Sequence, residues 1–242
     1  MAGDKKNKKI VLSTISWITS ALLLAVVILI ISGFQVPLFF GAFLISLLRI
    51  LIAYAIAVLL GMIVAFLFWK IQFLKKFFVP ILEGMQSFPA LLLLPLAAIW
   101  FGFNNFAIIF FLVFLIIWPI IFSAYSSLES MPRDWQGAAK VFGATGIKKI
   151  LYLILPTMFP GIITGSVIGW GSGWNAIVAA EILTAADIAI RPGIGAGLWE
   201  LAKSGRPTWV LLSGVAVFLI IIIIFNKFIW KPLLNKAELF TD

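Results

Sequence analysis

The sequence predicts an all-α protein that crosses the membrane several times. Of its 242 residues, 63% are hydrophobic and only 11% are charged, whereas a soluble domain carries about 25% charged residues. Several apolar runs exceed the roughly 18 residues that mark a membrane-spanning helix. The alternation of apolar and polar residues that marks an outer-membrane barrel is absent. No low-complexity linker divides the chain, so we expect a single domain over residues 1–242.

Six apolar segments are the expected membrane spans, and they cover residues 10–32, 50–69, 77–103, 106–128, 157–183 and 209–230. The first follows a lysine-rich flank but is too long for a signal peptide and lacks a cleavage site, so we expect an uncleaved additional helix. The second belongs to an apolar stretch that is too long for one span. We therefore expect a lateral segment at 38–48 before it.

The basic residues predict the orientation of these spans. With the N-terminus in the cytoplasm, 14 of the 18 Lys and Arg residues fall on the cytoplasmic side. Cytoplasmic loops of membrane proteins carry this excess of positive charge. We therefore expect a multi-pass protein of the prokaryotic plasma membrane with both termini in the cytoplasm. This orientation explains the net charge of +9, so membrane lipid is an expected partner and nucleic acid is not.

The composition excludes several kinds of chemistry. The chain has no Cys and no His, which removes thiolate nucleophiles, imidazole bases and the usual zinc ligands. No G-x-x-x-x-G-K-[ST] phosphate loop occurs, so ATP hydrolysis is not expected on this chain. We expect no catalytic residue, no metal site and no bound cofactor.

A polar and basic stretch at residues 133–156 interrupts the apolar pattern. Gly143 is expected to end a short helix in the left-handed conformation that glycine favours after a helix. Thr145 is expected to cap a second helix that runs towards Leu155. Ala138 and Ala139 give the first helix a surface of small side chains, against which the backbone of another protein can pack closely.

The spacing in this stretch resembles the cytoplasmic EAA loop of ABC importer permeases. Two alanines are followed by three residues, a glycine, nine residues and Leu-Ile-Leu-Pro. One departure is Gly137, which stands where the family usually has an acidic residue, and it argues against a specific ion pair with the ATPase. The resemblance implies that the ATPase contacts Trp135, Gly137, Ala138, Ala139, Lys140, Gly143, Leu155 and Pro156.

An ordered set of further motifs over residues 40–235 resembles permeases of the nitrate, sulfonate, taurine and bicarbonate type. The motifs include Gln86-Ser87-Phe88-Pro89-Ala90, Gly173-Trp174-Asn175, Ala179-Ala180-Glu181 and Gly193-Ile194-Gly195. The resemblance implies the type I ABC importer permease fold, with a core at about 40–230, six transmembrane helices and a cytoplasmic coupling helix. It also implies a permease homodimer or heterodimer, two ATPase subunits that carry ATP and Mg, an external binding protein and a small anionic substrate.

Polar and aromatic residues inside the expected spans are candidates for the translocation pathway, because polar groups at membrane depth usually face the bundle interior or a cavity. These candidates are Glu83, Gln86, Ser87, Arg49, Trp170, Trp174, Asn175 and Glu181. Glu83, Gln86 and Ser87 share one helix face by their spacing. Trp170 and Trp174 either bind a planar substrate or pack against another helix. Arg49 is a candidate ion-pair partner for Glu181.

Two alternatives remain open from the sequence. The chain could be a secondary transporter or channel subunit, or it could import a vitamin precursor instead of an anion.

Four glycines at 165, 169, 171 and 173 also thin the fifth span. Small residues allow close helix approach, and we expect this helix at the contact between subunits if the permease is a homodimer.

Overall fold

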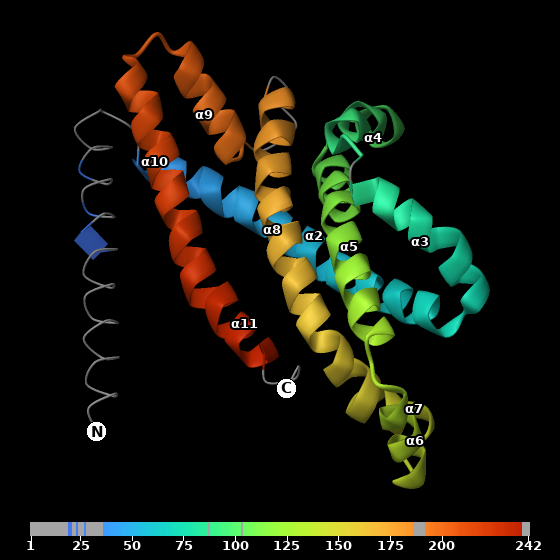
Figure 1. The fold of residues 1–242 in the computed structure, drawn as a ribbon. Helices are drawn as coiled ribbons and strands as arrows, with labels where there is room; N and C mark the ends of the chain where they lie inside the picture. The colour runs from blue at the N-terminus through green and yellow to red at the C-terminus, as the bar shows by residue number, and fades with distance from the viewer. Residues whose placement is uncertain are drawn as a thin grey trace, which may run out of the picture.

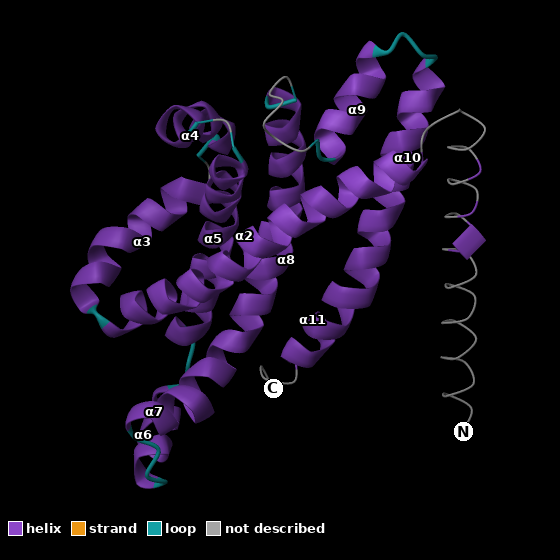
Figure 2. Ribbon diagram, turned by 180° about the vertical axis from the view of Figure 1, so that it is seen from behind, coloured by secondary structure: helices purple, strands orange, loops and turns teal. Residues whose placement is uncertain are grey.

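The computed structural model describes residues 36–238, apart from 87, 103 and 186–191, together with four isolated positions nearer the N-terminus. The expected first span at 10–32 lies outside the described residues except for these positions. All regular secondary structure in the described part of the chain is helical (Figure 2). The all-α prediction is therefore confirmed.

The helices follow one another with short connections (Figure 1). In chain order they are α2 (Val36–Lys70), α3 (Gln72–Gln86), a 3-10 turn (Ala90–Leu92), α4 (Leu93–Phe101), α5 (Asn105–Glu129), α6 (Arg133–Val141), α7 (Gly146–Lys149), a π-helical turn (Ile150–Ile154), α8 (Leu155–Leu183), α9 (Ile194–Lys203), α10 (Thr208–Phe225), a second π-helical turn (Asn226–Trp230) and α11 (Lys231–Glu238). Within the described residues, four helical stretches are long and apolar enough to cross a membrane: Phe39–Lys70, Asn105–Glu129, Gly146–Leu183 and Thr208–Ala237. The expected spans at 106–128, 157–183 and 209–230 are confirmed.

The separate lateral segment at 38–48 is wrong, because α2 is one continuous helix of 35 residues. Arg49, the residue at the expected junction, lies inside this helix and does not interrupt it. At 1.5 Å per residue, α2 is about 50 Å long, which exceeds the roughly 30 Å of a hydrocarbon core. A helix of this length fits a bilayer by tilting, and α2 does cross α8 and α5 obliquely (Figures 1 and 2).

The expected third span at 77–103 is also wrong as a single crossing. The structure divides it into α3, a short 3-10 turn and α4. The division falls at Pro89, because a proline disfavours helical geometry at the residue before it. Pro95 is tolerated because it lies in the first turn of α4, where a missing N–H breaks no helical hydrogen bond.

The core of the bundle is the antiparallel pair of α5 and α8, which lie side by side (Figure 1). Glycines at every fourth position of α8 permit the contact. A Cβ added at Gly161 would lie 2.2 Å from the Ser123 carbonyl oxygen, and one at Gly165 would lie 2.5 Å from the Pro119 carbonyl oxygen. The glycine face of α8 therefore packs inside the same chain. Of the four glycines at 165, 169, 171 and 173, only Gly171 would meet nothing within 4 Å if a Cβ were added. The expectation that this helix lies at a subunit contact stays a prediction.

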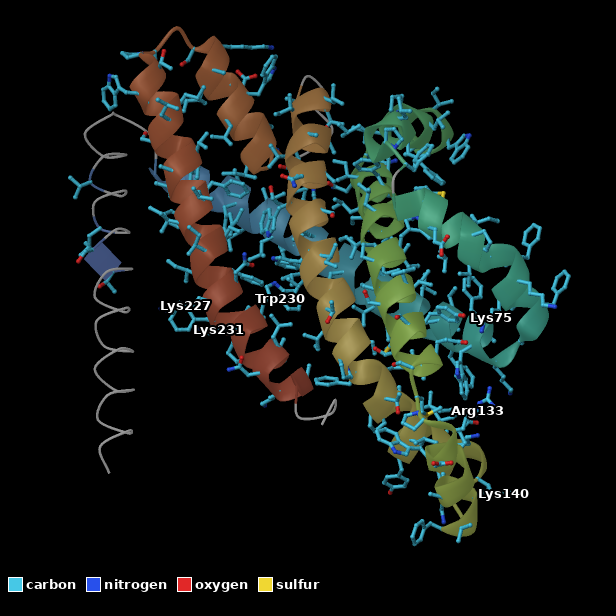
Figure 3. All side chains as sticks on the ribbon, viewed as in Figure 1. Lys75, Arg133, Lys140, Lys227, Trp230 and Lys231 are labelled. Atoms are coloured by element: carbon cyan, nitrogen blue, oxygen red, sulfur yellow. The ribbon has the colours of Figure 1, made fainter. Side chains whose placement is uncertain are left out.

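The charge of the molecule is unevenly distributed along the bundle. Lys75, Arg133, Lys140, Lys227 and Lys231 all lie in the half of the molecule that ends in α6 and α7 (Figure 3). These residues come from three separate parts of the chain, so the fold gathers at one end charges that lie far apart in the sequence.

Candidate functional site

The turn between α6 and α7 is a Schellman-type helix end built on Gly143. Its φ is +71°, a left-handed conformation that costs other residues about 1–2 kcal/mol. The Gly143 N–H donates to the Lys140 carbonyl at 3.1 Å, and the Ala144 N–H donates to the Ala139 carbonyl at 2.8 Å. This is the paired hydrogen bonding of the Schellman motif, and it confirms the predicted end of the first helix.

Thr145 stands at the N-cap position of α7, but its hydroxyl makes no capping hydrogen bond. Its backbone carbonyl instead accepts from the Lys148 N–H at 3.1 Å. The prediction of a helix beginning after Thr145 is confirmed, and the side-chain cap that was expected there is wrong.

Replacing Gly143 with alanine is expected to loosen this turn. The added methyl group meets no atom within 4 Å, so the cost is backbone strain of about 1 kcal/mol. Trypsin cleavage after Lys140 should become several times faster. The control is Gly137→Ala in the body of α6, where the methyl group also meets nothing and alanine favours the helix. Cleavage that slows in both variants would contradict the strained turn.

Apolar side chains stand exposed around this turn. Val141 and Phe142 are 84% and 87% exposed, and Ile147 and Tyr152 are 67% and 75% exposed. We call these four residues the coupling surface. Contiguous exposed apolar groups outside a lipid-facing region mark a protein interaction site. Helices α6 and α7 project beyond the rest of the bundle (Figure 1), which leaves the coupling surface accessible.

The coupling surface was missed in the sequence, although a signal was present. Val141 and Phe142 are adjacent apolar residues directly before the helix-ending Gly143, in a stretch that is otherwise polar. A helix end that projects into solvent cannot bury such side chains in its own chain.

The residues predicted to contact the ATPase fall into two groups. Trp135, Gly137, Ala138, Lys140 and Gly143 are exposed on and just after α6, and Ala139 is half-buried. Leu155 and Pro156 instead form the first turn of α8. They lie beyond the π-helical turn, away from the projecting tip, so only the first group shares the tip with the coupling surface.

Helix α7 continues into α8 without an intervening loop. The continuous helical stretch runs from Gly146 to Leu183 and has 38 residues. A π-helical turn at Ile150–Ile154 precedes Pro156, and the Thr157 hydroxyl donates to the Leu153 carbonyl at 2.7 Å. The π-helical turn makes room for the proline while the chain remains helical. Helix α7 of the projecting tip and the membrane-capable helix α8 therefore form one continuous helix.

The expected pair of Arg49 and Glu181 is present, and it joins α2 to α8. The Arg49 Nη1 lies 2.6 Å from the Glu181 Oε1, with side chains 5% and 1% exposed. Arg49 also donates to the Asn105 Oδ1 from Nε at 3.0 Å and Nη2 at 2.7 Å. The Ser46 hydroxyl lies 2.8 Å from both carboxylate oxygens of Glu181. Buried charges require such partners.

The start of α9 completes this cluster. The Gly195 N–H donates to the Glu181 Oε2 at 3.0 Å, and the Ile194 N–H donates to the Ser46 hydroxyl at 2.8 Å. A Cβ at Gly193 would lie 2.0 Å from a Glu181 carboxylate oxygen. The glycines of the Gly-Ile-Gly motif thus let the backbone approach the carboxylate. Arg49 and Glu181 are thus bonded to each other within the chain, and both also border a small hollow of about 20 Å³. Their place in the translocation pathway stays a prediction.

Trp170 and Trp174 pack inside the bundle. They are 2% and 4% exposed. Trp170 stacks on Phe225 with ring centroids 4.6 Å apart, and Trp174 stacks on Phe43 at 5.7 Å. The two indoles meet edge to face at 88°, so they form no continuous stacking surface. Of the two roles that the sequence left open, the structure favours helix packing.

Asn175 lies on the opposite, exposed face of α8. Its neighbours along this face are Thr164, Ile168 and Gly171, which are also exposed. With Ser172, Leu115 and Pro89, it lines a groove of about 340 Å³. Asn175 is therefore the pathway candidate of α8 that the structure leaves accessible.

The three candidates near the end of α3 are described only in part. Glu83 is exposed on α3. The helix ends at Gln86, and Ser87 lies outside the described residues, so the expected shared face is not established. No group of three or more Asp or Glu side chains in the described part of the chain could hold a metal ion.

Comparison with known proteins agrees with this architecture. Residues 57–230 match the family model of the binding-protein-dependent transport system inner membrane component. The chain is 35% identical over 176 residues to the taurine transport system permease protein TauC of Escherichia coli K12, which covers 73% of this chain and 62% of that protein.

Two further relatives show the same pattern. The nitrate import permease protein NrtB of Leptolyngbya laminosa is 31% identical over 72% of this chain and 61% of its own length. The bicarbonate transport system permease protein CmpB of Synechococcus elongatus is 27% identical over 71% of this chain and 60% of its own length. The chain thus matches about three fifths of the length of these relatives. Because the family model covers α5, α6, α7, α8 and α9 in full, the chain belongs to the family of binding-protein-dependent transport system inner membrane components.

Proposed function

We propose that this chain is the permease subunit of an ATP-driven importer and that it docks a separate ATPase through the coupling surface. The observation that carries the proposal is the exposed apolar tip of α6 and α7, which continues without a loop into α8. A push on this tip is transmitted along α8 because no flexible segment absorbs it. ATP and Mg then belong to the partner ATPase.

The orientation that follows places α6 and α7 in the cytoplasm of a prokaryotic cell, with both termini on the same side. The accumulation of Lys and Arg in this half of the molecule supports it (Figure 3), since positive residues are retained on the cytoplasmic side. An external binding protein would then deliver substrate to the opposite end, near α4 and α9.

The proposed substrate is a small anion. The relatives at 27–35% identity are named for taurine, nitrate and bicarbonate, which share small size and an anionic group. We propose that the exposed face of α8 with Asn175 lines the pathway. Its groove is open on one side within this chain, so a second permease subunit, identical or related, would close it. Buried Arg49 and Glu181 hold the helices together and do not contact the substrate.

The test of docking is a charge at the centre of the coupling surface. Phe142→Asp is expected to reduce ATPase co-purification at least tenfold, because aromatic anchors carry much of an interface's binding energy. Since Phe142 is 87% exposed, membrane insertion and the thermal stability of the permease should not change.

The matched control is Phe142→Leu, which keeps an apolar side chain at the same position and should retain the ATPase. If Phe142→Asp co-purifies the ATPase at the wild-type level, the coupling surface is not the docking site.

A further inference from the structure

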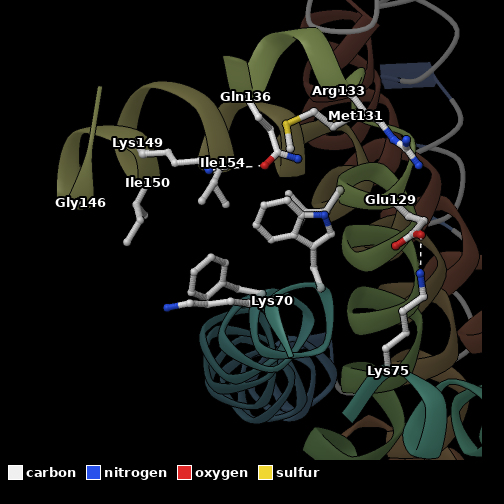
Figure 4. A pocket seen from close by; sticks show the side chains of 13 residues that line it. Lys70, Lys75, Glu129, Met131, Arg133, Gln136, Gly146, Lys149, Ile150 and Ile154 are labelled. Carbon is white, nitrogen blue, oxygen red and sulfur yellow. Dashed lines mark hydrogen bonds and ion pairs between the residues drawn. The ribbon is translucent and has the colours of Figure 1, made fainter. Parts of the chain in front are cut away.

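A hollow of about 740 Å³ lies between α6 and the adjoining ends of α2, α3 and α5. Figure 4 shows the labelled side chains placed around the hollow on these different elements, with the Lys75–Glu129 pair on one side and Lys70 and Lys149 on the other. Four of the described residues that line it are basic, namely Lys70, Lys75, Arg133 and Lys149, and one, Glu129, is acidic. The hollow is separate from the coupling surface, since none of the four residues of that surface lines it.

Only one of these positive charges is neutralised within the described chain. Lys75 forms an ion pair with Glu129, and this hydrogen bond raises the pKa of Lys75, which therefore stays charged. The Lys149 Nζ lies 3.5 Å from the Gln136 amide oxygen, a neutral partner. Lys70 Nζ lies 5.7 Å from the centroid of the Phe66 ring. Three cations around one hollow remain without a carboxylate.

The position of Arg133 adds to the positive potential. It is the first residue of α6, where the helix dipole already places partial positive charge. A basic residue is unfavourable there unless an anion lies nearby. Asp134 lies in the same first turn and complements the dipole, but it does not line the hollow. The acidic residue that does line it, Glu129, is paired with Lys75.

Below the basic rim, the hollow has an apolar floor. Trp69, Leu128, Ile150 and Ile154 line it. Leu128 and Ile154 are almost fully buried, so the half-buried Trp69 and Ile150 present its apolar surface. A hydrated inorganic ion would use the cations but gain nothing from these side chains. A phospholipid presents a phosphate and an apolar glycerol ester and acyl region together, and basic pockets between transmembrane helices bind such headgroups.

We propose that this hollow binds the phosphate of an anionic phospholipid, with Lys70, Arg133 and Lys149 around the phosphate and the acyl region against the apolar floor. The bound lipid would brace α6 against the end of α2, because Arg133 lies on α6 and Lys70 on α2. The proposal requires the cytoplasmic orientation stated above, but it does not depend on which ATPase or substrate the permease uses.

The test measures lipid binding to the full chain. Wild-type protein in phosphatidylcholine nanodiscs is titrated with phosphatidylglycerol, and retained lipid is read by native mass spectrometry. The variant Lys70→Gln/Arg133→Gln/Lys149→Gln should lose about a hundredfold of its preference for phosphatidylglycerol, since each basic residue contributes roughly fivefold. Arg133→Gln alone should lose about fivefold, which keeps the test valid if the triple variant misfolds.

The matched control removes the same charge elsewhere on the proposed cytoplasmic side. Lys76→Gln/Lys231→Gln/Lys236→Gln changes three exposed lysines that do not line the hollow, and its preference should stay within about twofold of the wild type. An equal loss in both triple variants would overturn the site.

Two further measurements test the alternative ligands for the hollow, which are a soluble anion and an acidic protein surface. Millimolar inorganic phosphate in phosphatidylcholine discs should leave bound phosphatidylglycerol in place. Displacement by phosphate would assign the hollow to a soluble anion and overturn the lipid proposal. Unchanged lipid retention in the variant, together with loss of ATPase co-purification, would assign the basic residues to an acidic protein surface and also overturn it.

Discussion

Replacing Glu181 with alanine is expected to destabilise the protein by about 3–5 kcal/mol, the cost of leaving one member of a buried ion pair without its partner. Arg49 is 4% exposed and would lose its carboxylate partner, while its hydrogen bonds to the neutral Asn105 side chain would remain. The Gly195 N–H would also lose its acceptor. Thermal unfolding in detergent should show a transition lowered by several degrees and reduced protection of α9 from proteolysis.

An exposed ion pair in the same chain provides the matched control. Glu129→Ala removes the carboxylate that pairs with Lys75. The Glu129 side chain is 48% exposed and the Lys75 side chain is 32% exposed. Such pairs contribute about 0–1 kcal/mol, so this variant should unfold nearly as the wild type does. If Glu181→Ala is no more destabilising than Glu129→Ala, the buried cluster does not hold the helices together.

A charge-swap variant adds detail to this result. Arg49→Glu combined with Glu181→Arg restores opposite charges across the two helices. We expect it to recover only part of the lost stability, because an arginine at 181 cannot accept the hydrogen bond from the Gly195 N–H. Failure to recover any stability would count against the ion pair as the source of the effect.

Gly165→Ala is expected to destabilise the protein strongly, because the added methyl group would force α8 away from α5. Its Cβ would lie 2.5 Å from the Pro119 carbonyl oxygen and 2.7 Å from the Ile120 Cα. Both neighbours are backbone atoms, so α5 and α8 must separate. Overpacking of this kind costs about 1–3 kcal/mol where side chains can move, and we expect at least the upper part of this range. The measurement is thermal unfolding of the purified protein.

Gly171→Ala is the control on the same helix. Its Cβ meets nothing within 4 Å, and alanine is favoured over glycine in a helix by about 1 kcal/mol. The stability should stay constant or increase. Equal destabilisation by the two substitutions would show that the glycines act through the backbone of α8 and not through its contact with α5.

The spans that could be predicted share one property, which is that their ends are marked locally. Asn104 caps α5 by accepting from the Ala107 N–H. Gly205, with a positive φ, follows the end of α9, and Pro207 directly precedes α10. The α2 helix was predicted wrongly because a long apolar run carries no mark of its tilt. Its oblique path depends on contacts with α5 and α8, which no local pattern contains.

The candidate site divides in the same way. The helix end at Gly143 was predictable, because a positive φ selects glycine from backbone sterics alone. The exposure of Val141 and Phe142 was not, because it depends on how far α6 projects from the bundle. The roles of Trp170 and Trp174 were also not predictable, because their spacing fits a substrate-binding face as well as helix packing. Their stacking on Phe225 and Phe43 is what favours packing.

The helical class, three of the six expected spans, the uneven charge and the family were readable from the chain alone. Each follows from hydrophobicity, charge or backbone preference, which act on one segment at a time. The closed cluster around Glu181, the glycine contact of α8 with α5, the coupling surface and the basic hollow needed the assembled helices. Each of these depends on which faces of separate helices meet, and that is set by packing among residues far apart in the sequence.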